Sequence, residues 1–428
     1  MTDRGIHKKG QRFAFDLLVN IGICVGSLFV SAWLLSGSNL TGAYIKNDLL
    51  TEPARIIFVV VWPLAYLSSW LFLRFHLRIL SFDWVNRVVI TNMACFLIIG
   101  SVLSVARVPL LSRTIFLTEF ILSSVTLLLF FFVRSHLFPI ILAVDRDVSV
   151  GQLPRSHGVR YLKLEELDHL PEGILGIVID STKKEITQHA MQFAEWAQKG
   201  LLIWEKRDLF QLIAGRMVLE EVTLSELEQI GPPRIYTEIR RICDLISAIL
   251  LLPIFIVLFL MAGLAIKLET RGPILFRQNR VGLNGNLFTM LKFRSMYNAR
   301  HQAKGAFAEK MDTRITKVGS FLRRFRLDEF PQLLNIIKGD MSLIGPRPEQ
   351  PNIVAEYSLS IPYYGYRHIV RPGVTGWAQV SYGYAASEAE SKRKLEYDFF
   401  YIKNMSVWLD LIIVFRTILT VLHGSGVR

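Results

Sequence analysis

Cysteine is scarce in this chain of 428 residues, with only Cys24, Cys95 and Cys243 present. All three lie in apolar segments, and none has the spacing of a metal site, so a disulfide framework is not expected. A cleavable signal peptide is not expected either, because the first apolar run is long and lacks a small-residue cleavage motif.

Acidic residues are also outnumbered: Asp and Glu total 36 against 49 Lys and Arg, a formal net charge of +13. A basic balance suits nucleic acid, anionic lipid or a phosphorylated substrate. Half of the chain is hydrophobic (51%), and these residues are clumped. Long apolar runs indicate a membrane protein, so we expect a lipid or phosphorylated partner and no nucleic acid.

Four segments reach membrane-spanning length, roughly 20 residues each. They lie at about 15–35, 56–73, 88–105 and 115–133. Basic residues favour both ends of this region in the cytoplasm. No segment carries a charge pair in its middle, so a transport pathway is not indicated. We expect an anchor or a dimerisation bundle.

A polar middle segment follows. Short apolar runs predict strands at 139–144, 174–179 and 201–204, and an amphipathic pattern predicts a helix at 184–199. A further short helix is expected at 164–169. Alternating strands and helices indicate a small α/β unit with a parallel sheet. No G-x-G-x-x-G follows the first strand, so we expect a structural or oligomerising role instead of dinucleotide binding.

The apolar stretch 242–266 is long enough to cross a bilayer, but Pro253 lies at its middle. Basic residues flank both of its ends, which favours two ends on one membrane face. We expect a kinked re-entrant helix. An ordinary helix that crosses with a kink is the alternative.

The stretch 319–348 carries the chemistry. Three arginines lead directly into the adjacent carboxylates Asp328 and Glu329. Pro331 favours a helix start near this point, and Gly339 favours a left-handed stop after a helix over 332–338. Unpaired N–H groups at a helix start favour anions, which would keep a carboxylate ionised and attract a phosphate. The pattern predicts a carboxylate nucleophile, Mg²⁺ and arginines that bind phosphate. The alternative is a helix-capping pair beside a solvated basic turn.

Residues 271–349 contain 15 Lys or Arg and 6 Asp or Glu. Lys292 and Arg294 alternate with apolar residues in a predicted hairpin around 282–286, facing either a phosphate or solvent. Arg347 lies between two prolines, which suits a rigid phosphate clamp. Farther on, a charged and solvated helix is expected at 388–396, with interfacial helices over 395–423.

Four motifs in this order resemble those of the bacterial sugar transferases, the monotopic polyprenyl-phosphate phosphoglycosyl transferases. They are KFRSM (292–296), D-x-R-I-T-x-x-G (312–319), LDEFPQLLNIIKGDMSLIGPRP (327–348) and RPGVTGWAQV (371–380). The resemblance covers roughly 233–423. It implies transfer of a sugar-1-phosphate from a UDP-sugar to polyprenyl (undecaprenyl) phosphate with Mg²⁺, as the first membrane step of surface polysaccharide synthesis. It also implies that Asp328 forms a phosphosugar-aspartyl intermediate, with Glu329 helping in metal or proton handling.

These observations together predict a mixed membrane protein. We expect four transmembrane helices (1–136), a small α/β, degenerate Rossmann-like domain (137–230) and an α/β catalytic domain (231–428) with a re-entrant helix at 242–266. The expected catalytic and metal-binding pair is Asp328 and Glu329. The expected phosphate ligands are Lys292, Arg294, Arg323, Arg324, Arg326, Arg347 and Arg371. We expect a homodimer in the bacterial inner membrane with its catalytic domain on the cytoplasmic face.

Overall fold

The computed structural model describes residues 16, 19, 20, 22, 66, 67, 69, 70, 88–96, 113–137, 139–145, 148–155, 158–164, 174–180, 190–198, 200–222, 230–232, 234–297, 314–383 and 387–423. Most of the first two predicted spans, half of the third, the predicted helix at 164–169 and Asp312 lie outside these residues. The chain forms two compact units, residues 1–214 and 215–428, which are described separately. The division into three domains stays a prediction.

The first unit contains the helix α5 (Arg113–Leu137), which covers the fourth predicted span. Side chains from three of the predicted spans form one buried apolar cluster: Tyr66, Trp70, Val88, Phe96, Leu127 and Phe130. Polar side chains also join these segments, since the Asn92 amide donates to the hydroxyls of Ser123 and Ser124 at 2.7 Å each. Packing of this kind is typical of helices that associate in a membrane.

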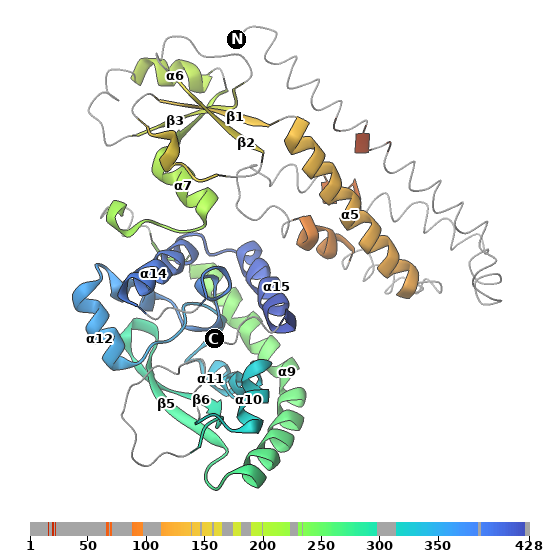
Figure 1. The fold of residues 1–428 in the computed structure, drawn as a ribbon, viewed down its shortest axis with the longest axis vertical. Coiled ribbons are helices and arrows are strands. Elements are labelled where there is room, and N and C mark those ends of the chain that lie inside the picture. The colour runs from red at the N-terminus through yellow and green to blue at the C-terminus, as the bar shows by residue number, and fades with distance from the viewer. Residues whose placement is uncertain are drawn as a thin grey trace, which may run out of the picture. The chain divides into compact units, whose positions relative to one another are not determined.

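A parallel sheet of four strands follows in the same unit, in the order β2-β1-β3-β4 (Figure 1). Its elements are β1 (Ile140–Val144), β2 (Val159–Lys163), β3 (Gly176–Ile179), α6 (Ala190–Gln198), β4 (Leu202–Glu205) and α7 (Lys206–Ala214). The small parallel α/β unit predicted from the sequence is confirmed. Sequence reasoning missed β2 because this strand lies at the sheet edge, where its side chains are largely exposed and no apolar run marks it.

The second unit is built on α9 (Arg234–Glu269), a helix of 36 residues. Within the described residues, Ile235–Glu269 is the one helix long and apolar enough to cross a membrane, and Ser123–Leu137 is a shorter apolar helix. One stripe of α9 joins the core of the second unit through Ala248, Phe255, Ala262 and Ile266. This stripe continues on both sides of Pro253, so both halves of α9 pack on the same unit.

The predicted hairpin is confirmed as β5 (Leu275–Val281) paired antiparallel with β6 (Leu287–Phe293). The helices α10 (Lys317–Arg324) and α11 (Gln332–Lys338) pack beside α9 (Figure 1). The helix predicted over 332–338 is also confirmed, with Gly339 at φ 97° as its left-handed stop.

The remaining elements complete the second unit. They are β7 (Ser342–Ile344), α12 (Pro351–Ser360), β8 (Gly373–Thr375), α13 (Trp377–Ser381), α14 (Glu388–Lys403) and α15 (Val407–His423). The prediction of a solvated helix over 388–396 is wrong at its end, because Glu396 is buried and paired with Arg216. The first part of the stretch predicted to be interfacial is a core helix instead, since Leu395 and Phe399 are buried.

Candidate active site

A tight backbone turn places the two adjacent carboxylates. Helix α10 ends at Arg324 with Phe325 as its C-cap, and Arg326 then adopts a left-handed conformation with φ 56°. A non-glycine residue in this conformation is uncommon and marks a turn held by its surroundings. The next three residues, Leu327–Glu329, form a short 3-10 turn before α11, whose N-cap is Pro331. Asp328 and Glu329 are both buried at this turn, with 8% and 7% exposure.

Glu329 is held by three cations. Its Oε1 accepts from Arg347 at 2.7 Å and from Lys292 at 3.0 Å, and it lies 3.7 Å from a guanidinium nitrogen of Arg326. Burial raises the pKa of this carboxyl, but Arg347 and Lys292 outweigh that effect and hold the pKa well below its usual range. Glu329 is therefore ionised at neutral pH.

Asp328 is the opposite case. No hydrogen bond or ion pair joins its carboxylate to another residue in the part of the chain that the structure describes. Burial raises its pKa, and the negative charge of Glu329 adds to that rise, against the attraction of Lys292 and Arg323. The sequence predicted that the field of a helix start keeps a carboxylate ionised here, but at Asp328 burial and Glu329 raise the pKa instead. Asp328 is an unpaired carboxylate beside a fixed positive cluster.

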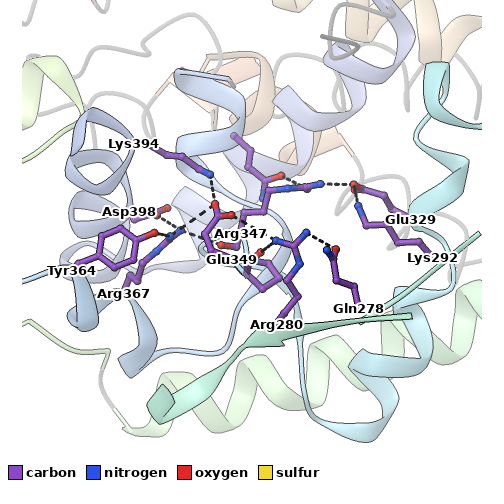
Figure 2. A network of polar contacts seen from close by, with 12 residues as sticks. Gln278, Arg280, Lys292, Glu329, Arg347, Glu349, Tyr364, Arg367, Lys394 and Asp398 are labelled. Atoms are coloured by element: carbon purple, nitrogen blue, oxygen red, sulfur yellow. Dashed lines mark hydrogen bonds and ion pairs between the residues drawn. The ribbon is translucent and has the colours of Figure 1, made fainter. Parts of the chain in front are cut away.

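A rigid loop carries Arg347 into this cluster. The guanidinium of Arg347 donates to Glu329 and also to Oε1 of Gln379 at 3.0 Å. Figure 2 shows Arg347 between Glu329 on one side and a second charged cluster around Glu349 on the other. Two arginines of that second cluster hold the loop backbone: Arg367 donates to the Arg347 carbonyl at 3.0 Å and Arg280 to the Pro348 carbonyl at 3.2 Å.

The second cluster is centred on Glu349. This carboxylate accepts from Lys394 at 2.7 Å and lies within 4.0 Å of Arg280 and Arg367. Burial raises the pKa of Glu349, but the three cations outweigh it and lower the pKa to about 2. Arg367 also pairs with the buried Asp398 at 2.8 Å. Each carboxylate here is paired, as a buried charge requires.

Glycines allow two loops to meet backbone to backbone beneath the site. The Gly345 N–H donates to the Thr375 carbonyl at 2.8 Å. A Cβ at Gly376 would lie only 2.1 Å from the Gly345 carbonyl oxygen, so no larger residue fits there. This contact joins the loop that carries Arg347 to the start of α13, which carries Gln379.

The structure brings together only part of the predicted phosphate-binding set. Lys292, Arg326 and Arg347 surround Glu329, and the charge of Arg323 acts on Asp328.

The other three arginines contact other groups. Arg294 is buried and donates to the Thr270 and Arg271 carbonyls at the end of α9, at 2.9 and 3.1 Å. Arg371 donates to the Gly339 carbonyl at 3.2 Å, and Arg324 lies over the Phe325 ring at 5.7 Å. Their binding of a phosphate stays a prediction.

A cavity of about 260 Å³ adjoins the carboxylate turn. Arg326, Glu329 and Gln379 line it, together with apolar side chains of α9, α11, β7, β8 and α15. The arrangement places a largely apolar cavity, a fixed group of cations and one unpaired carboxylate side by side.

The similarity to known proteins lies in the same part of the chain as this site. The family profile described as "Bacterial sugar transferase" matches residues 235–424. A UDP-glucose:undecaprenyl-phosphate glucose-1-phosphate transferase of Caulobacter vibrioides is 45% identical over 192 residues, which are 44% of this chain and 72% of that protein. The chain belongs to the bacterial sugar transferase family.

Two further relatives show how far the likeness extends. A UDP-N-acetylgalactosamine-undecaprenyl-phosphate N-acetylgalactosaminephosphotransferase of Aeromonas hydrophila is 46% identical over 226 residues, 53% of each chain. The uncharacterized sugar transferase EpsL of Bacillus subtilis is 38% identical over 194 residues, 44% of this chain and 90% of that protein. The match to the Aeromonas sugar transferase therefore spans about half of its length.

The carboxylate turn of this sugar transferase fits a divalent cation. The contacts of Glu329 with Lys292, Arg326 and Arg347 all go to Oε1, so Oε2 and the Asp328 carboxylate are available within one turn. Magnesium binds through one or two carboxylates together with substrate phosphates. The three cations around Glu329 disfavour a metal ion at this turn unless an anionic ligand binds with it.

Sequence reasoning did not single out Gln379 or the Glu349 cluster. Gln379 lies in the RPGVTGWAQV motif, so a signal was present. Its partner Arg347 lies 32 residues away along the chain, and nothing in the local pattern identifies such a pair.

Proposed function

We propose that this sugar transferase moves a sugar-1-phosphate from a UDP-sugar to polyprenyl phosphate through a covalent intermediate on Asp328. The observation that carries the proposal is the contrast at the carboxylate turn: Glu329 is held by three cations, whereas Asp328 beside it has no hydrogen bond or ion pair among the described residues. A nucleophile must have a free electron pair, and the cations beside it supply sites for the phosphates that it attacks. The names of the Caulobacter and Aeromonas relatives support a UDP-sugar donor and an undecaprenyl phosphate acceptor.

In the first step, a carboxylate oxygen of Asp328 bonds to the β-phosphorus of the donor. The bond from that phosphorus to the bridging oxygen breaks, and UMP leaves with its electron pair. Lys292, Arg326 and Arg347 offset the charge of the diphosphate. Glu329 keeps these three cations in place.

In the second step, a phosphate oxygen of the acceptor bonds to the same phosphorus. The bond to Asp328 breaks, which restores the carboxylate and leaves the sugar on a lipid diphosphate. The ionised phosphate oxygen needs no base, and Glu329, whose lowered pKa makes it a weak base, serves instead to hold the cations beside the phosphorus.

The carboxylates of Asp328 and Glu329 would hold Mg²⁺. When bound, this cation adds positive charge at the diphosphate and favours the ionised form of Asp328.

The anchoring of α9 supports a re-entrant helix with its bend at Pro253. Near its start, Arg241 donates to the Ile336 and Ile337 carbonyls at the end of α11, at 2.6 and 3.0 Å. At its far end, Glu269 accepts from the first amides of α10 at 2.7 and 3.0 Å.

Both ends of α9 are thus held by two short helices that follow each other in the chain. A straight helix of this length would span about 54 Å, more than a hydrocarbon core of about 30 Å. The outer face of α9 exposes Ile242, Leu250, Val257 and Leu264, which suits contact with lipid. A helix that enters the membrane and returns to the same face is compatible with the hydrogen bonds at both of its ends. It also keeps the site at the cytoplasmic interface.

For the first unit we propose a membrane anchor joined to a small α/β domain. The shared apolar cluster and the Asn92 hydrogen bonds support a bundle of four transmembrane helices. We propose a multi-pass homodimer in the inner membrane, with the parallel sheet in a structural or oligomerising role.

The test is release of UMP from a panel of UDP-hexoses and UDP-N-acetylhexosamines, with Mg²⁺ and undecaprenyl phosphate in detergent micelles. We expect acceptor-dependent turnover with at least one donor, lost on addition of EDTA. An enzyme that needs both substrates bound at once would give no UMP without acceptor. A protein that keeps the fold but only regulates assembly would release UMP with none of the donors.

A further inference from the structure

The cavity beside Glu329 has two kinds of wall. Most of its lining is apolar, from Leu251 of α9, Phe330 and Leu333 at α11, and Val374 of β8. At one end the lining changes to Arg326, Glu329 and Gln379. A cavity with one charged end and apolar walls suits an amphipathic ligand whose head is anionic.

The threonines of the cavity offer few free hydrogen-bonding groups. Thr417 and Thr375 are bonded to each other at 2.7 Å, and Thr417 also bonds the Ile413 carbonyl at 2.7 Å. Thr420 donates to the Arg416 carbonyl at 2.8 Å. A sugar or a uracil would find few partners against these walls, and burying its polar groups without partners is unfavourable. A hydrocarbon chain needs no such partner.

Unlike the threonines, Gln379 has a hydrogen-bonding group without a partner among the described residues. Because a guanidinium can only donate, the bond from Arg347 requires the Gln379 oxygen at that position and directs its NH₂ group the other way. That nitrogen is buried and has no acceptor among the described residues. It lies in a side chain that lines the charged end of the cavity, where an oxygen of an anionic head would supply the missing acceptor.

The position of the cavity favours a lipid. Its walls include Leu251 of α9 and Thr417, Thr420 and Val421 of α15. These two helices also expose apolar side chains on their outer faces, including Leu250 at 70% and Ile418 at 52%. A chain in the cavity can therefore continue along the same apolar helices into a membrane.

We propose that this cavity holds the first isoprene units of the polyprenyl phosphate acceptor, and that the Gln379 amide donates to the acceptor phosphate. The inference rests on the proposed function for its choice of lipid. It places the acceptor phosphate at Arg326 and Glu329, within two residues of Asp328, so the lipid approaches from the cavity. Arg326 then faces the donor diphosphate in the first step and the acceptor phosphate in the second, after UMP has left.

Two substitutions on one helix test the cavity. Thr420→Trp fills it, whereas Ile418→Trp adds the same ring to the outer face of α15. We expect Thr420→Trp to raise the KM for undecaprenyl phosphate at least tenfold more than the KM for the UDP-sugar, and Ile418→Trp to change both KM values by less than twofold. A rise confined to the donor KM, or equal effects of the two variants, would overturn the proposal.

Gln379→Glu tests the amide separately. The new carboxylate still accepts from Arg347, but it presents an oxygen instead of NH₂ to the acceptor phosphate. We expect the KM for undecaprenyl phosphate to rise at least tenfold, with a smaller change in the donor KM. An unchanged acceptor KM would show that this nitrogen does not contact the phosphate.

A photo-crosslinking measurement needs no donor, so it separates failure of this inference from failure of the proposed function. The probe is a polyprenyl phosphate with a diazirine on its second isoprene unit. We expect labelling within residues 374–380 and 417–421, competed by undecaprenyl phosphate and lost in Thr420→Trp but not in Ile418→Trp. Equal competition by dioleoylphosphatidic acid, or labelling of the outer faces of α9 and α15 alone, would overturn it.

Discussion

Two clusters of buried charge lie on either side of the loop Pro346–Pro348, and they differ in what they leave unpaired. Around Glu349, three cations meet a carboxylate whose neighbour Asp398 is also paired. Around Glu329, three cations likewise meet one carboxylate, but Asp328 beside it has no partner among the described residues. A fully paired cluster holds a loop in place. A cluster that leaves one buried carboxylate unpaired keeps a group available for reaction, at a cost in stability.

The largest effect should come from removing the unpaired carboxylate. We expect Asp328→Asn to lower turnover by at least about 10³-fold, while the melting temperature stays equal or rises because repulsion with Glu329 is removed. Glu329→Gln is the matched change on the adjacent residue. It leaves three cations unbalanced and should lower the free energy of unfolding by about 3 kcal/mol. Turnover assays and thermal melts of both variants in detergent check this, and equal melting temperatures would contradict the contrast between the two groups.

The next largest effect should come from the residue that joins the clusters. Arg347→Lys keeps the charge but cannot bond Glu329 and Gln379 at once, because the ammonium lacks the planar fork. We expect kcat/KM for the UDP-sugar to fall about 10²-fold. Lys338→Arg, at a largely exposed position, is the control and should change it little. A fall of less than twofold in Arg347→Lys would show that charge alone suffices there.

The cluster around Glu349 should make the stability of the folded chain depend on pH in the acid range. The pKa of Glu349 is about 2 in the folded chain against 4.5 as a reference, so the unfolded state binds the proton first as pH falls. The contribution of Glu349 is complete above pH 4.5 and disappears between pH 4.5 and 2, with an upper size of about 3 kcal/mol. Burial next to Arg367 lowers the pKa of His368 to about 4, so its contribution is lost in the same direction between pH 6.5 and 4.

Melting curves of wild type and Glu349→Gln from pH 7 to pH 3 check this. Wild type should lose stability steadily below pH 6.5, and the variant should begin less stable and show a flatter slope below pH 4.5. Parallel slopes in that range would mean that Glu349 is not held ionised by its three partners.

The smallest effect is expected at Arg294, where a substitution should change stability but not substrate binding. Because its guanidinium holds the Thr270 and Arg271 carbonyls directly after α9, we expect Arg294→Lys to lower the free energy of unfolding by about 2 kcal/mol. The KM for the UDP-sugar should change by less than twofold, in contrast to Arg347→Lys. A large rise in that KM with no loss of stability would return Arg294 to the phosphate-binding set.

Local signals in the sequence predicted much of this arrangement. Pro331 and Gly339 marked α11, and the adjacent carboxylates with Lys292, Arg326 and Arg347 marked the site. Hydrogen-bond and ion-pair partners that are distant in the chain were not predictable, because they depend on burial and tertiary packing. Arg294 looked equivalent to Lys292 on the same strand, yet it contacts the end of α9 and not the carboxylate turn. The difference depends on where α9 ends in space, which no local pattern encodes.

The most direct test of the central claim is peptide mass spectrometry after incubation with Mg²⁺ and the UDP-sugar that supports turnover, without acceptor. The account predicts that the peptide containing Asp328 gains the mass of one sugar phosphate, that the gain disappears on addition of undecaprenyl phosphate, and that Asp328→Asn shows none. An equal gain in Asp328→Asn, or no adduct in an enzyme that turns over normally, would contradict it.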